Sequence, residues 1–233
     1  MLWKRQDTKV LKDNKTFQFD ALWFSDSYNG LMDDGFEISV NKNIENIVSI
    51  TTKPIIYDLS ACSSNDEVLH KIKALDKLGV SMVVIEDDER SSTNNVCDQL
   101  SSAKRSNSMI LGVKIRLDQK EVGAMLDRAA HFVEAGADAI MISGSQENLS
   151  AILDFAGKLR KNNSKTLIAV DTADLESFSE SQLQEKGINL TVYSNQLTRC
   201  GFMSMRSIAE KILTDCGSDQ MLNSINDIKK ILK

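Results

Sequence analysis

Two acidic residues follow apolar segments of the chain in a way that indicates a shared cation site. Asp58 ends the segment "PIIYD", and Glu86 ends "MVVIE" and is followed by Asp87. Apolar, β-branched runs of this kind are typical of buried parallel strands, whose carboxyl ends meet at one edge of a sheet. Two carboxylates there suit Mg²⁺, which needs only one or two protein carboxylates and keeps most of its waters. The alternative is that each acid is solvated or caps the next helix, the commoner situation for a single acid.

Eight such segments alternate with amphipathic ones, which is typical of β-α units and a parallel sheet. We predict helices over residues 65–78, 121–135, 146–160, 178–187, 205–215 and 224–232. The predicted strands are Lys9–Leu11, Ala21–Ser25, Pro54–Asp58, Met82–Glu86, Ile110–Arg116, Ala139–Ser143, Leu167–Asp171 and Leu190–Ser194. The pattern favours a (β/α)₈ TIM-type barrel with a shortened first β-α unit and C-terminal helices, in a single domain over residues 1–233. An open doubly wound sheet is the alternative.

Composition and charge argue against several classes of partner and site. The net charge of −5 argues against a nucleic-acid partner or a membrane-surface partner, since both require basic surfaces. No segment approaches the roughly 18 uninterrupted apolar residues of a membrane span, and the first residues lack a signal peptide's apolar core, so a cytoplasmic location is expected. The cysteines, Cys62, Cys97, Cys200 and Cys216, have no spacing typical of a zinc site or a disulfide framework.

Chemistry in a β/α barrel takes place at the carboxyl ends of the strands. The polar residues at those ends are Ser25, Asp26, Asp58, Ser60, Glu86, Asp87, Lys114, Arg116, Ser143, Asp171 and Asn195. Residues 90–108, "RSSTNNVCDQLSSAKRSNS", are polar with little periodicity, and we interpret them as a mobile lid or surface excursion.

Five segments, in this order, carry a resemblance to a known superfamily: "FDALWFSDS", "KPIIYDLSACS", "LGVSMVVIEDD", "EAGADAIMISGS" and "NLTVYSNQLTRCGFMSMRSIAEKILTD". Over about residues 19–233 the chain resembles the phosphoenolpyruvate mutase/isocitrate lyase superfamily, in particular its phosphoenolpyruvate mutase and phosphonopyruvate hydrolase branch. The resemblance implies a Mg²⁺-dependent enzyme that acts on a small anionic 2-oxo acid or phosphonate.

The resemblance also implies roles for individual residues. Asp58 would be the principal Mg²⁺ ligand, and Glu86 would support the metal through water. Trp23, Ser25 and Ser143 would contribute to the substrate pocket. Asp34 would lie in a loop after the strand that contains Trp23 and Ser25. Asn94 would be the substrate-contacting asparagine of a gating loop, and Lys114 would neutralise the far anionic group of the substrate.

Several positions depart from the family's pattern. Ser60 replaces the second aspartate of the metal motif, and Ser92 replaces the gating lysine. Lys114 stands in place of an arginine, which retains the charge but loses a bidentate fork. Ile142 stands in place of a histidine. The loops after the predicted Met82–Glu86 and Ile110–Arg116 strands are also shorter than the family's. A shorter lid would weaken the exclusion of water from a reactive enolate, which puts the mutase reaction itself in question.

Three functions remain open. The first is a divergent enzyme that stabilises an enolate with Mg²⁺ as a C–C or P–C bond breaks or forms. The second is a catalytically silent relative with a structural, partner-binding or metabolite-sensing role. The third, which we rank lowest, is a different barrel chemistry with Cys62 as nucleophile, because His70 and His131 both fall in predicted helices away from it. The apolar faces of the C-terminal helices fit either a homo-oligomer interface or packing within one subunit.

Overall fold

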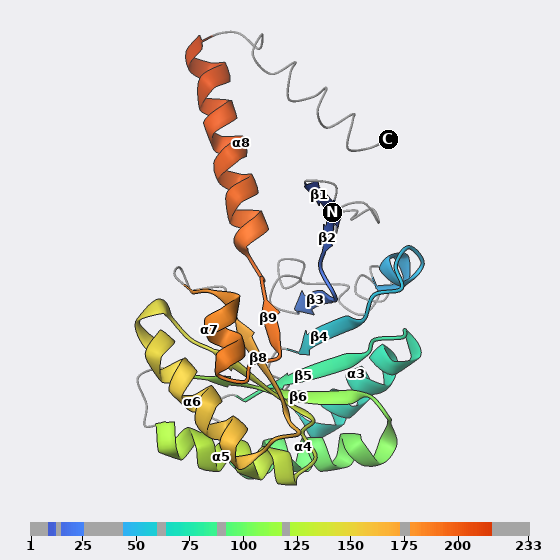
Figure 1. Ribbon diagram of the computed structural model, residues 1–233. Coiled ribbons are helices and arrows are strands. Elements are labelled where there is room, and N and C mark those ends of the chain that lie inside the picture. The colour runs from blue at the N-terminus through green and yellow to red at the C-terminus, as the bar shows by residue number, and fades with distance from the viewer. Residues whose placement is uncertain are drawn as a thin grey trace. The chain divides into compact units, whose positions relative to one another are not determined.

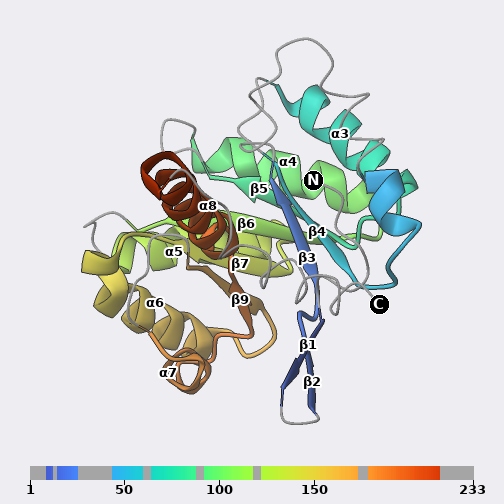
Figure 2. The ribbon, with the colours of Figure 1, turned by 90° about the horizontal axis from the view of Figure 1, so that it is seen from above.

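A computed structural model describes residues 9–12, 15–25, 44–59, 64–87, 92–117, 122–172 and 178–215 of the chain. Seven parallel strands form one sheet, and their order in the sheet is their order in the chain. They are β3 (Leu22–Ser25), β4 (Ile55–Leu59), β5 (Met82–Glu86), β6 (Ile110–Arg116), β7 (Ala139–Ser143), β8 (Leu167–Asp171) and β9 (Leu190–Val192). The sheet curls into a nearly closed barrel with β3 and β9 at its two ends (Figures 1 and 2). The predicted TIM-type α/β barrel is confirmed.

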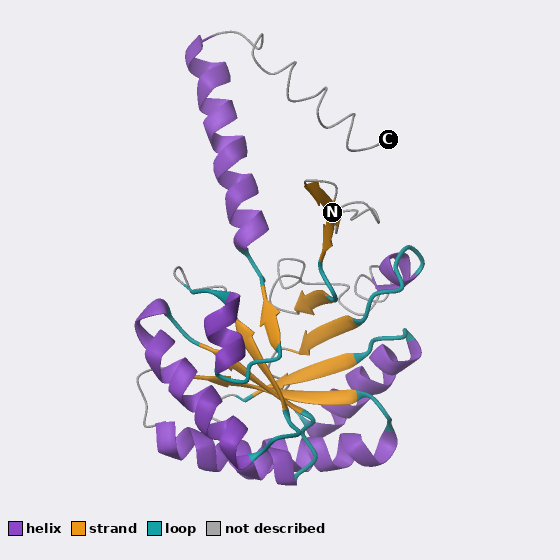
Figure 3. Cartoon of the chain, in the orientation of Figure 1, coloured by secondary structure: helices purple, strands orange, loops and turns teal. Residues whose placement is uncertain are grey.

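Helices lie outside these strands (Figure 3). They are α3 (Asn65–Lys77), α4 (Thr93–Ser106), α5 (Val122–Glu134), α6 (Leu149–Asn162) and α7 (Glu180–Glu185), with the 3₁₀ turn η1 (Gln146–Asn148) before α6. Residues 44–48 form a further short helix. Capping residues set the limits of α3. At its start the Ser64 hydroxyl accepts a hydrogen bond from the Glu67 amide at 3.2 Å, and just after its end Gly79 has a φ of +82°.

Strand β4 shows how the barrel separates two cores. Ile55, Tyr57 and Leu59 belong to the core between the strands and the helices, whereas Ile56 belongs to the core inside the barrel. Successive side chains of a strand point to opposite faces, so Asp58 shares the inner face with Ile56. Position along the strand therefore decides whether a strand-end residue faces the helices or the barrel mouth, which is the end of the barrel where the strands have their carboxyl ends.

The interpretation of residues 90–108 as a lid or surface excursion is wrong for most of this segment, because α4 occupies residues 93–106. Ser92 caps the helix, and its hydroxyl accepts a hydrogen bond from the Asn95 amide at 3.3 Å. The helix buries Val96, Leu100 and Ala103 at helical spacing. The many serines and asparagines hid this narrow apolar stripe, which is enough to hold the helix on the barrel.

The first predicted strand forms, but it does not belong to the barrel. Strand β1 (Lys9–Lys12) pairs antiparallel with β2 (Lys15–Gln18) in a separate two-stranded sheet. Asp13 and Asn14 separate the two strands in the sequence, and both residue types are common in short hairpin connections. The barrel sheet of the described residues thus has seven strands where eight were predicted.

The barrel residues Asp20–Val192 make one compact unit, and the described residues on either side belong to a second. That second unit contains the hairpin and α8 (Gln196–Asp215), which begins before the predicted residue 205. The predicted helix 224–232 lies outside the described residues, and the single domain over residues 1–233 stays a prediction. Within the ranges given above, no helix combines the length and apolarity needed to cross a membrane.

Candidate active site

The inner face of the sheet brings polar residues from six strands to one end of the barrel. In β5, Val84 belongs to the inner core, so Glu86 shares that face. In β6, the backbone register pairs Lys114 with Glu86 on one side and with the inner-core residue Met141 on the other. By the same alternation Ser25, Asp58, Ser143 and Asp171 each lie two residues beyond a residue packed in or against the inner core, at the carboxyl end of its strand.

Lys114 is the centre of this group. Its Nζ lies 3.0 Å from Asp58 Oδ2 and 3.9 Å from Asp171 Oδ2. Strands β4 and β8 lie two strands from β6 in opposite directions, so the ammonium reaches across the barrel mouth. The side chains of Asp58, Lys114 and Asp171 are all less than one-fifth exposed, which strengthens their electrostatic interactions.

Burial and neighbouring charges shift the pKa values of both Asp58 and Lys114. Burial raises the pKa of the Asp58 carboxyl from its ordinary 3.8 to about 6, even though the Lys114 ammonium favours the ionised form; Glu86 and Asp171 raise it further. Burial alone would lower the pKa of Lys114, but Asp58, Asp171 and Glu86 together raise it above its ordinary 10.5. Above about pH 6 the Asp58 carboxylate and the Lys114 ammonium therefore form an ion pair at the mouth.

The donors at the mouth fit a magnesium ion. Within the described part of the chain, no three histidine, cysteine, aspartate or glutamate residues gather to form a metal cage. Mg²⁺ does not require one, because it is commonly bound through one or two carboxylates with water and substrate oxygens completing the shell. Asp58 offers a buried carboxylate, whose Oδ2 contacts a cation, the ammonium of Lys114. Glu86, exposed on the adjacent strand, is the second oxygen donor.

Asp87, beside Glu86 in the sequence, has a different position. It follows β5 on the helix-facing side, where Arg128 of α5 binds both of its carboxylate oxygens at 2.6 Å. The Arg128 guanidinium also lies 5.8 Å from the centroid of the Phe132 ring. The Asp87 amide donates to the Lys114 carbonyl at 3.0 Å, which extends the β5–β6 pairing by one residue. Asp87 thus fixes the strand end that carries Glu86.

The remaining predicted site residues are more scattered. Trp23 is half-buried against the inner core. Asn94 lies in the first turn of α4 with an exposed side chain, so it belongs to a helix and not to a gating loop. Ile142 is fully buried against the helices, which means that this position does not face the mouth, whereas Ser143 does. Asp34 lies outside the described residues.

Two residues at the mouth were noted in the sequence only as strand ends. Asp171 ends β8 and contacts Lys114. Arg116 ends β6 on the same face as Lys114, is exposed, and pairs in register with Ser143. Both could have been identified from the alternation of side chains along a strand. Asp171 lies two residues after the inner-core residue Ala169, and Arg116 lies four residues after Gly112, which packs against inner-core side chains.

The cysteine hypothesis gains no support from the described residues. Cys62 lies outside them, and both histidines lie in helices, His70 in α3 and His131 in α5. Cys97 of α4 has its Sγ 3.7 Å from the His131 carbonyl oxygen, and burial raises the pKa of its thiol. A raised thiol pKa disfavours the nucleophilic thiolate.

Solved structures share this fold. The chain is similar to a phosphoenolpyruvate phosphomutase from Streptomyces platensis subsp. rosaceus, with a TM-score of 0.75 and 19% identity over 91% of this chain and 84% of the other. It is also similar to a phosphonopyruvate hydrolase in complex with oxalate and Mg²⁺, with a TM-score of 0.74 and 19% identity over 92% of this chain and 83% of the other. A 2,3-dimethylmalate lyase of the same superfamily gives a TM-score of 0.66 at 18% identity, over 92% of this chain and 82% of the other.

Sequence comparison agrees with the fold. A curated phosphoenolpyruvate phosphomutase from Streptomyces hygroscopicus is 30% identical over 106 residues, which are 46% of this chain and 33% of the relative. The match thus spans about a third of the curated relative's length. A sequence profile of the family described as phosphoenolpyruvate phosphomutase matches residues 15–213. The resemblance is therefore confirmed: this chain belongs to the phosphoenolpyruvate phosphomutase family.

Proposed function

We propose that this chain is a divergent enzyme of its family that acts on a small 2-oxo acid or phosphonate and breaks or forms a C–C or P–C bond. The observation that carries the proposal is the buried Asp58 carboxylate beside Lys114 at the carboxyl end of the barrel strands. Such an arrangement supplies both a cation-binding oxygen and a fixed positive charge at the place where β/α barrels carry out chemistry. Lyase, mutase and hydrolase reactions that pass through an enolate can all use these two elements.

Asp58 would hold Mg²⁺, with Glu86 supporting it through water. When bound, the ion would act as a Lewis acid that stabilises the negative charge of an enolate oxygen. This cofactor assignment is supported by the oxygen donors at the mouth and by the Mg²⁺ named for the related phosphonopyruvate hydrolase.

The other residues of the mouth would bind and orient the substrate. Lys114, with Arg116 beyond it on the same strand face, would neutralise the far anionic group. Ser25 and Ser143 would hydrogen-bond the carboxylate, and Trp23 would shape the apolar side of the pocket. The family resemblance also implies catalytic roles for Asp34 and Asn94, but the place of Asn94 in α4 does not support its role.

One observation favours a second candidate, a catalytically silent relative with a structural, partner-binding or metabolite-sensing role. The Lys114 ammonium already neutralises Asp58 at 3.0 Å, so the mouth is electrostatically satisfied without a metal. Binding measurements separate the two candidates, since only a working enolate site needs both an ion and an oxyanion ligand.

The test is isothermal titration calorimetry with Mg²⁺ and then with oxalate, an enolate mimic, in the presence and absence of the metal. We expect oxalate binding that requires Mg²⁺ and that disappears in Asp58→Asn. Asp154→Asn is the matched control, because Asp154 is an exposed acid of α6 paired only with its helical neighbour Lys158 among the described residues. Oxalate binding in the wild type would justify following phosphonates by ³¹P NMR and 2-oxo acids by enzymatic product assays.

Two results would count against the enzyme. Equal Mg²⁺ affinity in wild type and Asp58→Asn would remove Asp58 as the metal ligand. No binding of either Mg²⁺ or oxalate would favour the silent relative and a search for protein partners.

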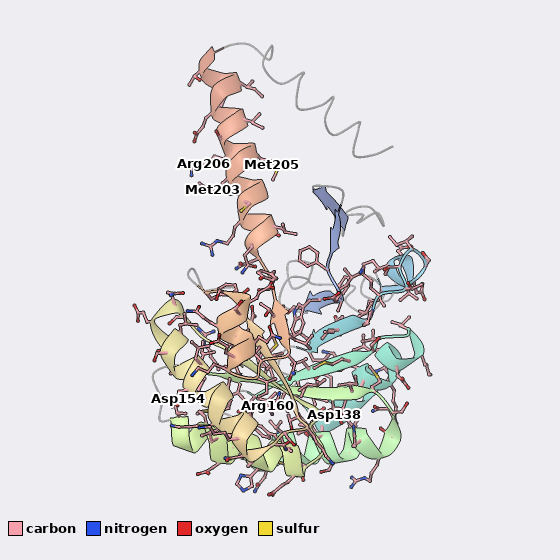
Figure 4. All side chains as sticks on the ribbon, in the orientation of Figure 1. Asp138, Asp154, Arg160, Met203, Met205 and Arg206 are labelled. Atoms are coloured by element: carbon pink, nitrogen blue, oxygen red, sulfur yellow. The ribbon has the colours of Figure 1, made fainter. Side chains whose placement is uncertain are left out.

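We further propose a homo-oligomer whose interface includes α8. Large apolar side chains project from this helix, among them Met203 and Met205 (Figure 4). Those more than 40% exposed are Leu197, Phe202, Met203, Met205, Ile208, Ile212 and Leu213. Apolar exposure of this extent is typical of an interaction surface, and a second copy of the chain supplies a matching one. Light scattering after size exclusion should show a multimer, and a double substitution of Phe202 and Ile208 by serine should reduce it.

A cytoplasmic location is part of the same proposal. Cys97 and Cys200 are free thiols. Free thiols are the usual state in a reducing compartment.

A further inference from the structure

The position of the Lys114 ammonium raises a question that the proposed metal site does not answer. The ammonium contacts the same carboxylate that would hold the metal, with Nζ 3.0 Å from Asp58 Oδ2. A divalent cation bound to Asp58 would therefore lie within a few ångströms of a like charge in a largely buried site, where such repulsion is strong. Metal binding then requires that the lysine move away from Asp58.

Asp171 offers the lysine a second partner. Its Oδ2 is 3.9 Å from Nζ, and its side chain is 13% exposed, so a short rotation of the lysine side chain is enough to bring the pair into hydrogen-bonding distance. Asp58 and Asp171 reach the ammonium from β4 and β8, which lie two strands from β6 in opposite directions, so the lysine can exchange one carboxylate for the other. A lysine side chain has four rotatable bonds and can make this change without any shift of the strand.

We propose that Lys114 competes with Mg²⁺ for Asp58 and that Asp171 is the positioning residue that accepts the ammonium when the metal binds. The inference rests on the proposed magnesium site and adds its regulation: the affinity for the metal is set by an exchange of ion-pair partners within the barrel mouth. The displaced ammonium remains at the mouth, where it is available to the anionic substrate.

Glu86 is the other carboxylate that acts on Lys114. Its side chain is exposed, so its interaction with the ammonium is screened by water and salt. The less exposed Asp171 is consequently the stronger alternative partner.

The experiment is a double-mutant cycle measured by calorimetric titration of Mg²⁺ into metal-stripped protein at about pH 8, where Asp58 is ionised. The variants are Lys114→Met, Asp171→Asn and the double variant, each checked for an intact fold by thermal melting. We expect Lys114→Met to bind Mg²⁺ at least about tenfold more tightly than the wild type. Asp171→Asn should bind it about tenfold more weakly, because the ammonium then loses Asp171 as its alternative partner.

The double variant separates partner exchange from a simple loss of charge near the metal. If Asp171 acts through Lys114, Asp171→Asn changes Mg²⁺ affinity by less than about threefold in the Lys114→Met background. An equal effect in both backgrounds overturns the inference, as does a Lys114→Met variant that binds no more tightly than the wild type. Lys114→Gln serves if the methionine variant does not fold, and Lys158→Met, an exposed lysine of α6, is the control that should leave the affinity unchanged.

The same titrations distinguish failure of this inference from failure of the proposed function. Mg²⁺ binding that is equal in wild type and Lys114→Met removes the competition but leaves the metal site in place. No Mg²⁺ binding by the wild type or by any variant removes the metal site and the competition together.

Discussion

The raised pKa of Asp58 predicts that this carboxyl lowers the stability of the metal-free protein as the pH rises. The folded protein holds the Asp58 proton up to about pH 6, whereas an unfolded chain releases it near 3.8. Between these values the folded state binds more protons than the unfolded state, so the free energy of unfolding falls with increasing pH. The difference of about 2 pH units, at about 1.4 kcal/mol each, corresponds to a loss of about 3 kcal/mol, complete above the folded pKa.

The assay is urea unfolding of wild type and Asp58→Asn in EDTA at several pH values between about 4 and 7.5. Other carboxyl groups titrate in both proteins, so the difference between the two free energies of unfolding isolates Asp58. We expect the wild type to lose about 2–3 kcal/mol relative to the variant across this range. Saturating Mg²⁺ at the upper end should restore part of the loss, because a ligand that binds only the folded state stabilises it. A difference that stays flat or rises with pH would refute the reasoning.

Two further predictions concern stability away from the mouth, both measured by urea unfolding at neutral pH. Arg128→Met leaves the Asp87 carboxylate, whose side chain is 3% exposed, without its bidentate partner. We expect the free energy of unfolding to fall by about 3–5 kcal/mol. Lys158→Met, which breaks an exposed pair, should lower it by less than about 1 kcal/mol. A similar small loss in both variants would contradict this. Phe155→Ala removes a fully buried ring from the helix-facing core and should cost about 3–5 kcal/mol; a loss below about 1 kcal/mol would mean that the site collapses.

The barrel strands could be predicted because two features of the sequence agree. Segments such as Met82–Glu86 are both β-branched and uninterrupted, as strands buried on two faces must be. Glycines with positive φ, such as Gly79 and Gly136, mark helix ends in the structure as they do in the sequence. The failures have equally physical causes. Helix α4 buries a narrow stripe beneath a polar surface, and β1 finds its partner in β2, a neighbour in the chain that sequence reasoning had not assigned as a strand.

The site was less predictable than the strands because the side of the strand on which a residue lies matters there more than the residue type. Glu86 and Asp87 are chemically alike and adjacent in the sequence. Glu86 nevertheless faces the mouth, whereas Asp87 pairs with Arg128 between the strands and the helices. The sequence pointed to Lys114 but gave no indication of its contact with Asp58, which comes from a strand two positions away in the sheet. Contacts across a barrel depend on strand stagger, and no spacing along the chain encodes them.

The Asp87–Arg128 and Asp58–Lys114 ion pairs also differ in what they contribute, and that difference bears on function. Arg128 binds both oxygens of Asp87 and joins a strand end to α5, so this pair has a structural reason to exist. Asp58 and Lys114 join no helix to the barrel, and burial alone disfavours the charged form of each. An apolar pair would fill that space at lower cost to the fold. A costly charged pair at the carboxyl ends of parallel strands is best explained by what it binds, which makes Asp58 and Lys114 the first residues to test in any search for a substrate.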